Sequence, residues 1–173
     1  MDNQLPVKDI TYGTKRHGDR SYKTASAMLY SVQKSMKSSK VVTFDDSSFV
    51  SNIKRVTANK DLIIFEDRRL RLSDIKIIET VDRIDVDFIQ SRMMGEPRNI
   101  VEAKTFNLIL NKAHAVNKDV AVFMKDREIY KGKSTTHDYD SLRLVTHDNR
   151  DFLIMYDAVK RIVPLEGDGS LAE

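Results

Sequence analysis

The order of short apolar segments in this chain occurs twice, and this repetition constrains the fold more than any other feature of the sequence. In each half, a helical spacing is followed by about five short β-prone runs with polar turns between them. Corresponding runs lie about eighty residues apart. The pattern predicts two copies of a small unit that consists of one helix and several short strands.

The first copy begins at Tyr22. Apolar residues from Ala25 to Met36 recur at steps of three and four, which places them on one face of a helix. The period then changes towards two, as is typical of strands separated by turns. Strands are expected at 41–44, 49–56, 62–65, 70–72 and 75–78.

The second copy repeats this order from Phe106, with Ile109, Leu110 and Ala113 on the expected helix face. Strands are expected at 120–124, from residue 129 onward, at 142–145 and within 154–163. Gly132 takes the place of Asn52, a turn or bulge position in both halves. The alternative is a single α+β sheet whose strands merely look alike.

We therefore expect a mostly β chain with helices (α+β), built as two tandem small β-barrels of Sm-like or SH3-like type, each preceded by a helix. The expected parts are a mobile basic arm (1–21), a helix with a small β-barrel (22–79), a packed connector and hinge (80–99), a second helix with a barrel (100–165), and a tail (166–173). Units of this size have marginal cores, so the halves should pack on each other or on a partner.

Composition excludes several classes of protein. The 173 residues include no Cys, which excludes a disulfide scaffold, a Cys-ligated metal site and a cysteine nucleophile. No apolar run approaches the roughly 20 residues needed to span a bilayer, so a soluble, cytoplasmic protein is expected. The 29 Lys and Arg against 26 Asp and Glu give a formal charge of +3, too small to imply nucleic acid by itself.

The second half resembles Sm-like proteins of the bacterial Hfq type. The similarity rests on Phe106-Asn107, Val120-Ala121-Val122-Phe123, Gly132, Asp140 and the run from Tyr156 to Pro164. That family carries a Lys-His pair after the tyrosine of its last loop, which binds RNA, whereas this chain has Asp157 and Ala158 there. Because a carboxylate repels phosphate, the resemblance implies the fold but not the family's usual RNA pore.

The chain also resembles YolD-like proteins of Gram-positive bacteria, which have a basic arm, a helix and a small barrel. The similarity lies in the run from Asp19 to Leu29 and in the acidic-hydrophobic run from Asp74 to Glu79. The chain departs from that family at Tyr22, where tryptophan is expected, and it lacks the Pro-Glu-His that should follow the leucine. The resemblance implies an accessory role beside translesion polymerases of DNA-damage operons.

Basic side chains cluster at corresponding places in the two halves and are the candidate contact residues. In the first half they are Lys54, Arg55, Arg68, Arg69 and Arg71. In the second half they are Lys125, Arg127, Lys131 and Lys133. Aromatic residues within reach are Phe49, Phe65 and Tyr130. Sm-like barrels bind nucleic acid with such groups, but the acids interleaved among them also fit a solvated or protein-contacting face.

The sequence contains no nucleophile elbow, Walker loop or dinucleotide-binding glycine pattern. His137 with Asp138 and Asp140 has the composition of an oxygen-rich metal corner, and so has His147 with its neighbouring acids. A solvated loop between strands is the favoured interpretation of both sets. We expect no enzyme activity, no metal and no cofactor.

The function that we expect is that of a non-catalytic regulatory or adaptor protein that acts through protein contacts at barrel edges. The YolD-like resemblance suggests a Y-family DNA polymerase as the protein partner, and copies of the chain could also pair as a homo-oligomer. The alternative is an RNA- or DNA-binding Sm-like protein of Hfq type.

Overall fold

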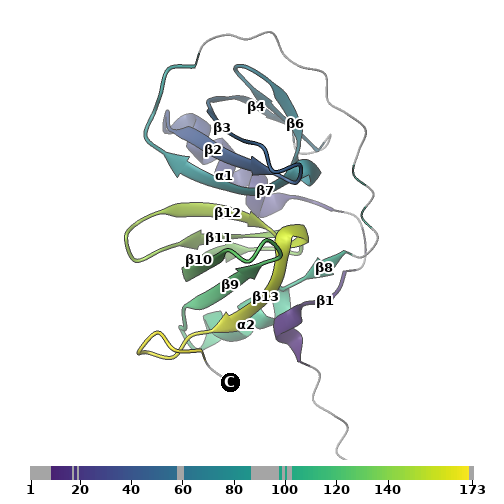
Figure 1. Cartoon of the computed structure of the whole chain (residues 1–173), viewed down its shortest axis with the longest axis vertical. Helices are drawn as coiled ribbons and strands as arrows, with labels where there is room; N and C mark the ends of the chain where they lie inside the picture. The colour runs from purple at the N-terminus through teal and green to yellow at the C-terminus, as the bar shows by residue number, and fades with distance from the viewer. Residues whose placement is uncertain are drawn as a thin grey trace, which may run out of the picture.

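The computed structural model describes residues 9–16, 18, 20–57, 61–86, 98, 100 and 103–171, and these residues form a mostly β structure with two α-helices (Figure 1). The N-terminal segment contains η1 (Ile10–Tyr12) and β1 (Thr14–Lys15). The first half contains α1 (Lys23–Lys34), β2 (Ser38–Thr43), β3 (Ser48–Ser51), β4 (Ile53–Thr57), β5 (Leu62–Phe65), β6 (Arg69–Arg71), η3 (Leu72–Asp74) and β7 (Ile75–Val81). The second half contains β8 (Lys104–Thr105), α2 (Asn107–Ala115), β9 (Val120–Met124), β10 (Ile129–His137), β11 (Ser141–Val145), β12 (Asp151–Met155), η4 (Tyr156–Ala158) and β13 (Val159–Pro164).

The two halves share one strand order. The second half has the strand order β13-β9-β10-β11-β12. The first half has the order β7-β2-β3 in one sheet and β4-β5-β6 in another, and β3 and β4, which together correspond to β10, are separated by Asn52. In both halves the last strand therefore lies beside the first. The sheets are open, so the expected mostly β architecture is confirmed whereas closed barrels are not. The sheet continues instead of closing because β12 pairs with β7 of the other half.

Corresponding turns also match. Met36 and Asn117, each just after a helix, have positive φ angles of 60° and 53°, and Asp46 and Arg127 in the first hairpin turns have 64° and 75°. The ladder between the first and last strands shifts register at the same place in both halves, between Val42 and Thr43 and between Val159 and Arg161. Agreement at such irregular positions supports a duplication more strongly than strand order alone.

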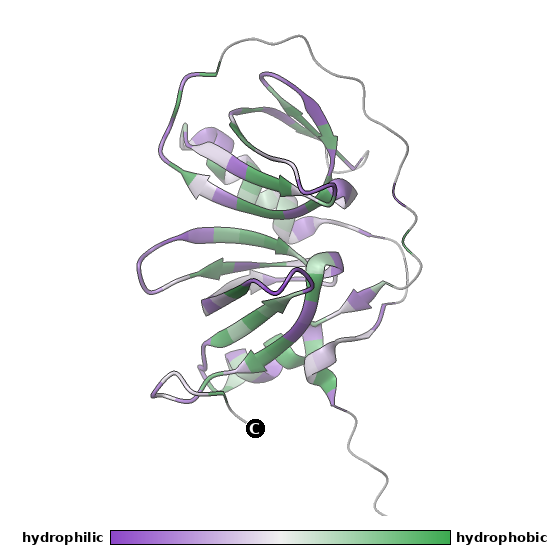
Figure 2. Ribbon diagram, in the orientation of Figure 1, coloured by the Kyte–Doolittle hydropathy of each residue, from purple (hydrophilic) through white to green (hydrophobic). Residues whose placement is uncertain are grey.

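The joint between the halves is a continuous antiparallel ladder. Leu153 lies opposite Ile78 and Ile154 opposite Ile77, and Arg150 binds the Glu79 carboxylate through two hydrogen bonds of 2.9 and 3.1 Å. Leu153, from the second half, is fully buried in the core of the first half, while Ile77 from the first half belongs to the core of the second. The halves thus share their cores, and the apolar residues lie along the strands that meet there (Figure 2).

The two helices close the cores. The buried residues of α1 recur on one face, and the helix packs against β4 of its own half and β11 of the other. Helix α2 packs against β10 and β13. Neither helix among the described residues is long and apolar enough to cross a membrane.

The N-terminal segment differs from the expected mobile arm. Its described part docks on the second half, where β1 pairs with β8 and η1 packs beside β13. Arg16 forms a buried ion pair of 2.7 Å with Asp140, and Arg20 makes hydrogen bonds of 2.6 and 2.9 Å to Asp157. The cations of this part pair with buried acids far along the chain, which the periodicity of the sequence does not report.

Two other expected segments are only partly described. The connector begins inside β7, and Ile84 then donates its amide to the Ser38 hydroxyl at 2.9 Å. Residues 87–97 and 99, which include all of the expected hinge (92–99) except Arg98, lie outside the described residues. In the tail, Leu165 forms an isolated antiparallel bridge with Leu171, so the described part of that segment turns back on itself.

Gly132, expected as a turn or bulge position, lies inside the continuous strand β10, whose register shift comes later, between Ser134 and Thr136. At this residue β10 changes partner, pairing with β9 up to Gly132 and with β11 from Lys133 onward. A Cβ atom at Gly132 would lie 2.4 Å from the carbonyl oxygen of Val145, closer than real contacts allow. Glycine is therefore required here by the close approach of a neighbouring strand.

Candidate nucleic-acid interface

The three-stranded sheet β4-β5-β6 brings together most of the basic residues predicted in the first half. Arg55 lies opposite Ile64, and Ile64 lies opposite Arg69 on the other side. Leu62 likewise lies between Thr57 and Arg71. Residues directly opposite each other project from the same face of a sheet. Arg55, Arg69 and Arg71 therefore surround Leu62 and Ile64 on one face, which we call the arginine face.

A bulge adds a further cation beside this face. The register between β4 and β5 shifts between Ile53 and Arg55, so Lys54 is the extra residue, and both Lys54 and Arg55 are exposed. The side chains of Lys54, Arg55 and Arg69 make no hydrogen bond or ion pair with any described residue. These three charges are therefore available to an anionic ligand.

Arg71 sits closer to an acid than its neighbours do. Its guanidinium is 3.8 Å from the carboxylate of Asp74, which is half-buried. Burial raises the pKa of Asp74, and the attraction of Arg71 and Arg98 only partly opposes this. The arginine face therefore has, beside Arg71, an acid whose charged form is disfavoured by burial.

Arg68, unlike these arginines, has a structural role. It binds the carboxylate of Asp67 at 2.8 Å and lies 3.7 Å above the centre of the Phe49 ring. Burial disfavours the charged form of Asp67, but hydrogen bonds from Arg68 and from the Ser51 hydroxyl outweigh it and hold the pKa of that carboxyl below its usual range. Phe49 in turn packs edge-on against Phe65, so neither ring is presented as a stacking platform.

The predicted cations of the second half are spread over two places. Lys125 and Arg127 are exposed in the β9–β10 turn, next to the exposed acids Asp126 and Glu128. Lys131 and Lys133 are exposed on one face of β10. The alternation of charge in the turn makes it a weaker anion site than the arginine face.

Tyr130 does not join these cations. Its ring packs 4.9 Å from that of Phe152, beside the core of the second half. Burial raises the pKa of the Tyr130 phenol, and the nearby acid Glu128 adds to this effect. The residue supports the core rather than offering a ring to a base.

Asp138 and Asp140, which have the composition of a metal corner in the sequence, accept backbone amides at the start of α1. One carboxylate oxygen of Asp140 accepts the backbone amides of Ser21 and Tyr22, at 3.0 and 2.9 Å, and Asp138 accepts that of Thr24 at 2.7 Å. They satisfy the free amides at the start of α1. No group of His, Asp or Glu within the described ranges could hold a metal ion.

Sequence reasoning missed the ionic cluster formed by Arg16, Arg20, Arg98, Asp140 and Asp157. Burial opposes the charge of Arg20, but hydrogen bonds and attraction from Asp157 outweigh it and raise the pKa of the guanidinium. Arg98 also lies 3.5 Å from Asp157. The charge of Asp157, the carboxylate expected to repel phosphate, is therefore compensated by Arg20 and Arg98. No local signal marks this cluster, because its members come from four distant segments.

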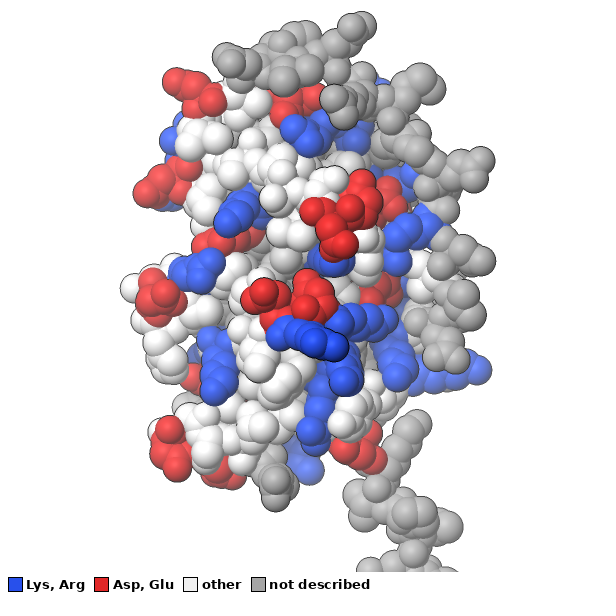
Figure 3. All heavy atoms as spheres, in the orientation of Figure 1, with Lys and Arg blue, Asp and Glu red and all other residues white. Residues whose placement is uncertain are grey.

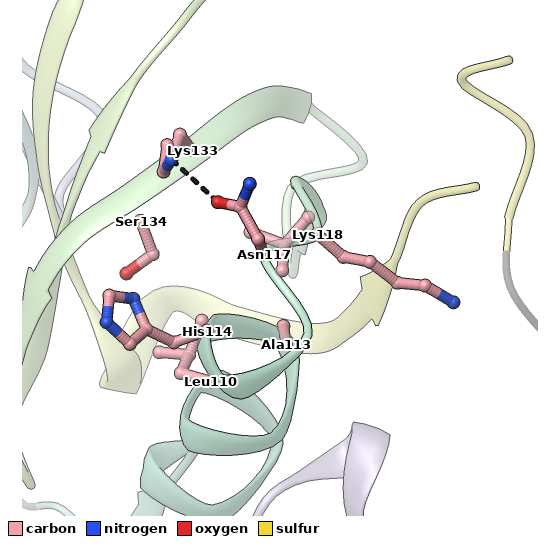
Figure 4. Close-up of a pocket in the computed structure, with 8 residues that line it drawn as sticks. Leu110, Ala113, His114, Asn117, Lys118, Lys133 and Ser134 are labelled. Carbon is pink, nitrogen blue, oxygen red and sulfur yellow. Dashed lines mark hydrogen bonds between the residues drawn. The ribbon is translucent and has the colours of Figure 1, made fainter. Parts of the chain in front are cut away.

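A small pocket lies between the C-terminal end of α2 and β10 (Figure 4). It is lined by Leu110, Ala113, His114, Asn117, Lys118, Val120, Lys133 and Ser134. Lys133 donates to the side-chain oxygen of Asn117 at 2.9 Å across its rim, while the buried Ser134 hydroxyl has no partner among the described residues. The space suits one water molecule bound to that hydroxyl, which is too little for a substrate.

A family model described as "repressor of phase-1 flagellin" matches residues 9–162 of the chain. No curated protein matches, and no solved structure matches. The matched range runs from the N-terminal segment into β13 and thus covers both halves, including the arginine face.

Proposed function

The chain belongs to the family of repressors of phase-1 flagellin, and from that premise we propose that it lowers production of a flagellin as a non-catalytic protein that binds single-stranded RNA. A repressor of one product has to recognise the gene, its transcript or the product itself. The proposal is that the transcript is recognised, and that the arginine face provides the main contact.

The arginine face is the observation that carries this proposal. Arg55, Arg69 and Arg71 project from neighbouring strands of one small sheet, around the aliphatic side chains of Leu62 and Ile64. Arginine pairs with phosphate through its planar fork and also stacks on bases, while the aliphatic patch can contact base faces. A flat basic sheet with an apolar centre is suited to an extended, unpaired strand.

RNA is favoured over duplex DNA by the placement of the arginines. A protein that reads the major groove usually inserts a helix with an exposed basic face. Here the three arginines that share one face lie on β4 and β6, not on a helix. Sheet surfaces of small β domains are the usual sites for single strands.

A regulatory role is supported by the family match. The family is named for repression, which is a regulatory and not a catalytic activity. The polymerase-accessory role implied by the YolD-like resemblance gains no support from the family match and stays an untested prediction.

The proposal predicts salt-dependent binding that depends on three named arginines. We expect the protein to shift single-stranded RNA from the transcript of a phase-1 flagellin in a gel assay, more strongly than duplex DNA of the same sequence. Replacing Arg55, Arg69 and Arg71 by Gln should weaken binding and lower the magnitude of the slope of log K against log salt by about 2, since each lost phosphate contact contributes about 0.7 for single strands.

The matched control removes the same charge elsewhere. Lys23, Lys34 and Lys112 are exposed on the helices, and their replacement by Gln should leave the slope nearly unchanged. Equal losses in both triple variants would point to net charge alone, and absence of any RNA shift at micromolar protein would contradict the proposed function.

A further inference from the structure

A second basic surface lies on the other half of the molecule, where β1 pairs with β8. Lys15 and Lys104 are direct partners in this ladder, and both are exposed. Like charges placed opposite each other across two strands destabilise the pair. Neither lysine side chain makes a hydrogen bond or ion pair with any residue in the described part of the chain.

The surrounding contacts hold the two lysines in place despite their repulsion. Gly13, two residues before Lys15, has a φ of 85°, and a Cβ there would lie 3.1 Å from the Phe106 ring and 3.3 Å from the Cβ of Lys104. Arg16 on the other side is anchored to the buried Asp140. The segment is therefore fixed at both ends of the β1 strand, and the juxtaposed charges are built into the fold.

Tyr12 lies in η1, three residues before Lys15, and η1 packs against β13, which carries further cations. The Tyr12 ring is 42% exposed, with the Arg161 guanidinium 4.8 Å from its centre. Arg161 also donates to the Thr11 hydroxyl at 2.9 Å. Lys160 is the extra residue at the β13 register shift and is exposed, just as Lys54 is at the corresponding kind of bulge in β4.

Figure 3 shows the result on the surface. Lys and Arg side chains gather over the region of β13, β8 and β1, while acidic side chains dominate the area above it, nearer the first half. Asp9, 3.8 Å from Arg161, is the acid paired to this group among the described residues. Two unpaired lysines in register, a third exposed lysine on β13 and an exposed tyrosine form a site for an anion that also carries aromatic rings.

We propose that this surface, formed by Tyr12, Lys15, Lys104, Lys160 and Arg161, is a second contact site for the same RNA strand that the arginine face binds. Phosphates lie between Lys15 and Lys104, where a negative charge relieves their repulsion, and a base stacks on Tyr12. The inference rests on the proposed function, because the ligand is the same strand.

The positions of the two sites in the sheet order determine how the strand is held. The arginine face lies at the β4-β5-β6 end of the first half, and β13 is the edge strand at the far end of the second. A short RNA occupies one site at a time, whereas a longer RNA reaches both. The second contact is then intramolecular. Affinity therefore rises with RNA length by more than the larger number of binding positions on a longer strand would give.

The test compares RNAs of about 6 and about 30 nucleotides, spanning the range of single-strand site sizes. The wild-type protein is expected to bind the longer RNA at least about tenfold more tightly, within the range of gains seen on linking two contacts. The Lys15→Gln, Lys104→Gln double variant should lose most of this gain and still bind the short RNA through the arginine face. A Lys23→Gln, Lys112→Gln variant should behave like the wild type.

The outcomes separate this inference from the proposed function. If the wild type binds both RNAs and the double variant keeps the full gain with length, the second site is wrong and the arginine face stands. If the wild type binds neither RNA, both fail. Because the variant removes a repulsion, its thermal unfolding midpoint should not fall below that of the wild type, which excludes misfolding as the cause of lost binding.

Discussion

Replacing Asp140 by Ala is expected to lower the free energy of unfolding by about 3–5 kcal/mol, the usual cost of removing one partner of a buried ion pair. The side chains of Arg16 and Asp140 are 5% and 0% exposed, so the variant leaves a buried guanidinium without its carboxylate. It also removes the acceptor of the Ser21 and Tyr22 amides, which lie at the start of α1. Urea unfolding followed by circular dichroism measures the change.

The control for this prediction is Asp82→Ala. Asp82 pairs with Lys37 at 3.1 Å, but its side chain is 98% exposed, and such surface pairs contribute little. If Asp140→Ala destabilises the protein no more than Asp82→Ala does, the docked N-terminal segment contributes nothing to stability and the ionic cluster has been misjudged.

The second large effect is expected at the joint between the halves. Leu153 is fully buried, lies opposite Ile78 in the β12–β7 ladder, and belongs to the core of the other half. Leu153→Ala should cost about 2–5 kcal/mol through lost burial and the cavity left behind. Because the cores are shared, both halves should still unfold in one transition. The free energy of opening measured by amide hydrogen exchange should therefore be the same for Val41 and Val122.

A matched apolar substitution provides the comparison. Ile129 is 50% exposed at the start of β10, so Ile129→Ala should have a much smaller effect. Two separate transitions, one for each half, would contradict the shared core even if both variants were destabilised.

Much of the fold could be predicted from the sequence because it is local. The strand β9 begins and ends at the expected residues, and the repeat places α2 and β11 correctly to within a few positions. These elements are amphipathic or continuously apolar, so the spacing of their apolar residues indicates whether they form a helix or a strand. Ser38 and Ser39 are an exception, since they precede the strand expected at 41–44 but are fully buried in β2, where Ser38 donates to the Asn52 side chain.

What could not be predicted depends on contacts between distant segments. The repeat indicates two units, but not that β12 pairs with β7, because apolar strands pair equally well in several arrangements. The basic segment before Tyr22 looks mobile until Asp140 and Asp157 are placed beside it.

The candidate site was predicted as residues rather than as a surface. Arg55, Arg69 and Arg71 were singled out from sequence, and the register of β4-β5-β6 shows that they share a face. The same register could not have been read from spacing alone, since the bulge at Lys54 shifts the alternation by one residue. The Lys15–Lys104 pair was missed because a two-residue strand leaves no period to detect.

The central claim is that an RNA strand contacts the arginine face, and photo-crosslinking tests it most directly. RNA from the transcript of a phase-1 flagellin, carrying 4-thiouridine, is crosslinked to the full chain and the attached peptides are identified by mass spectrometry. We expect crosslinked peptides from β4 to β6, which diminish in the Arg55, Arg69 and Arg71 variant. Crosslinks confined to other surfaces, or an unchanged pattern in that variant, would contradict the account.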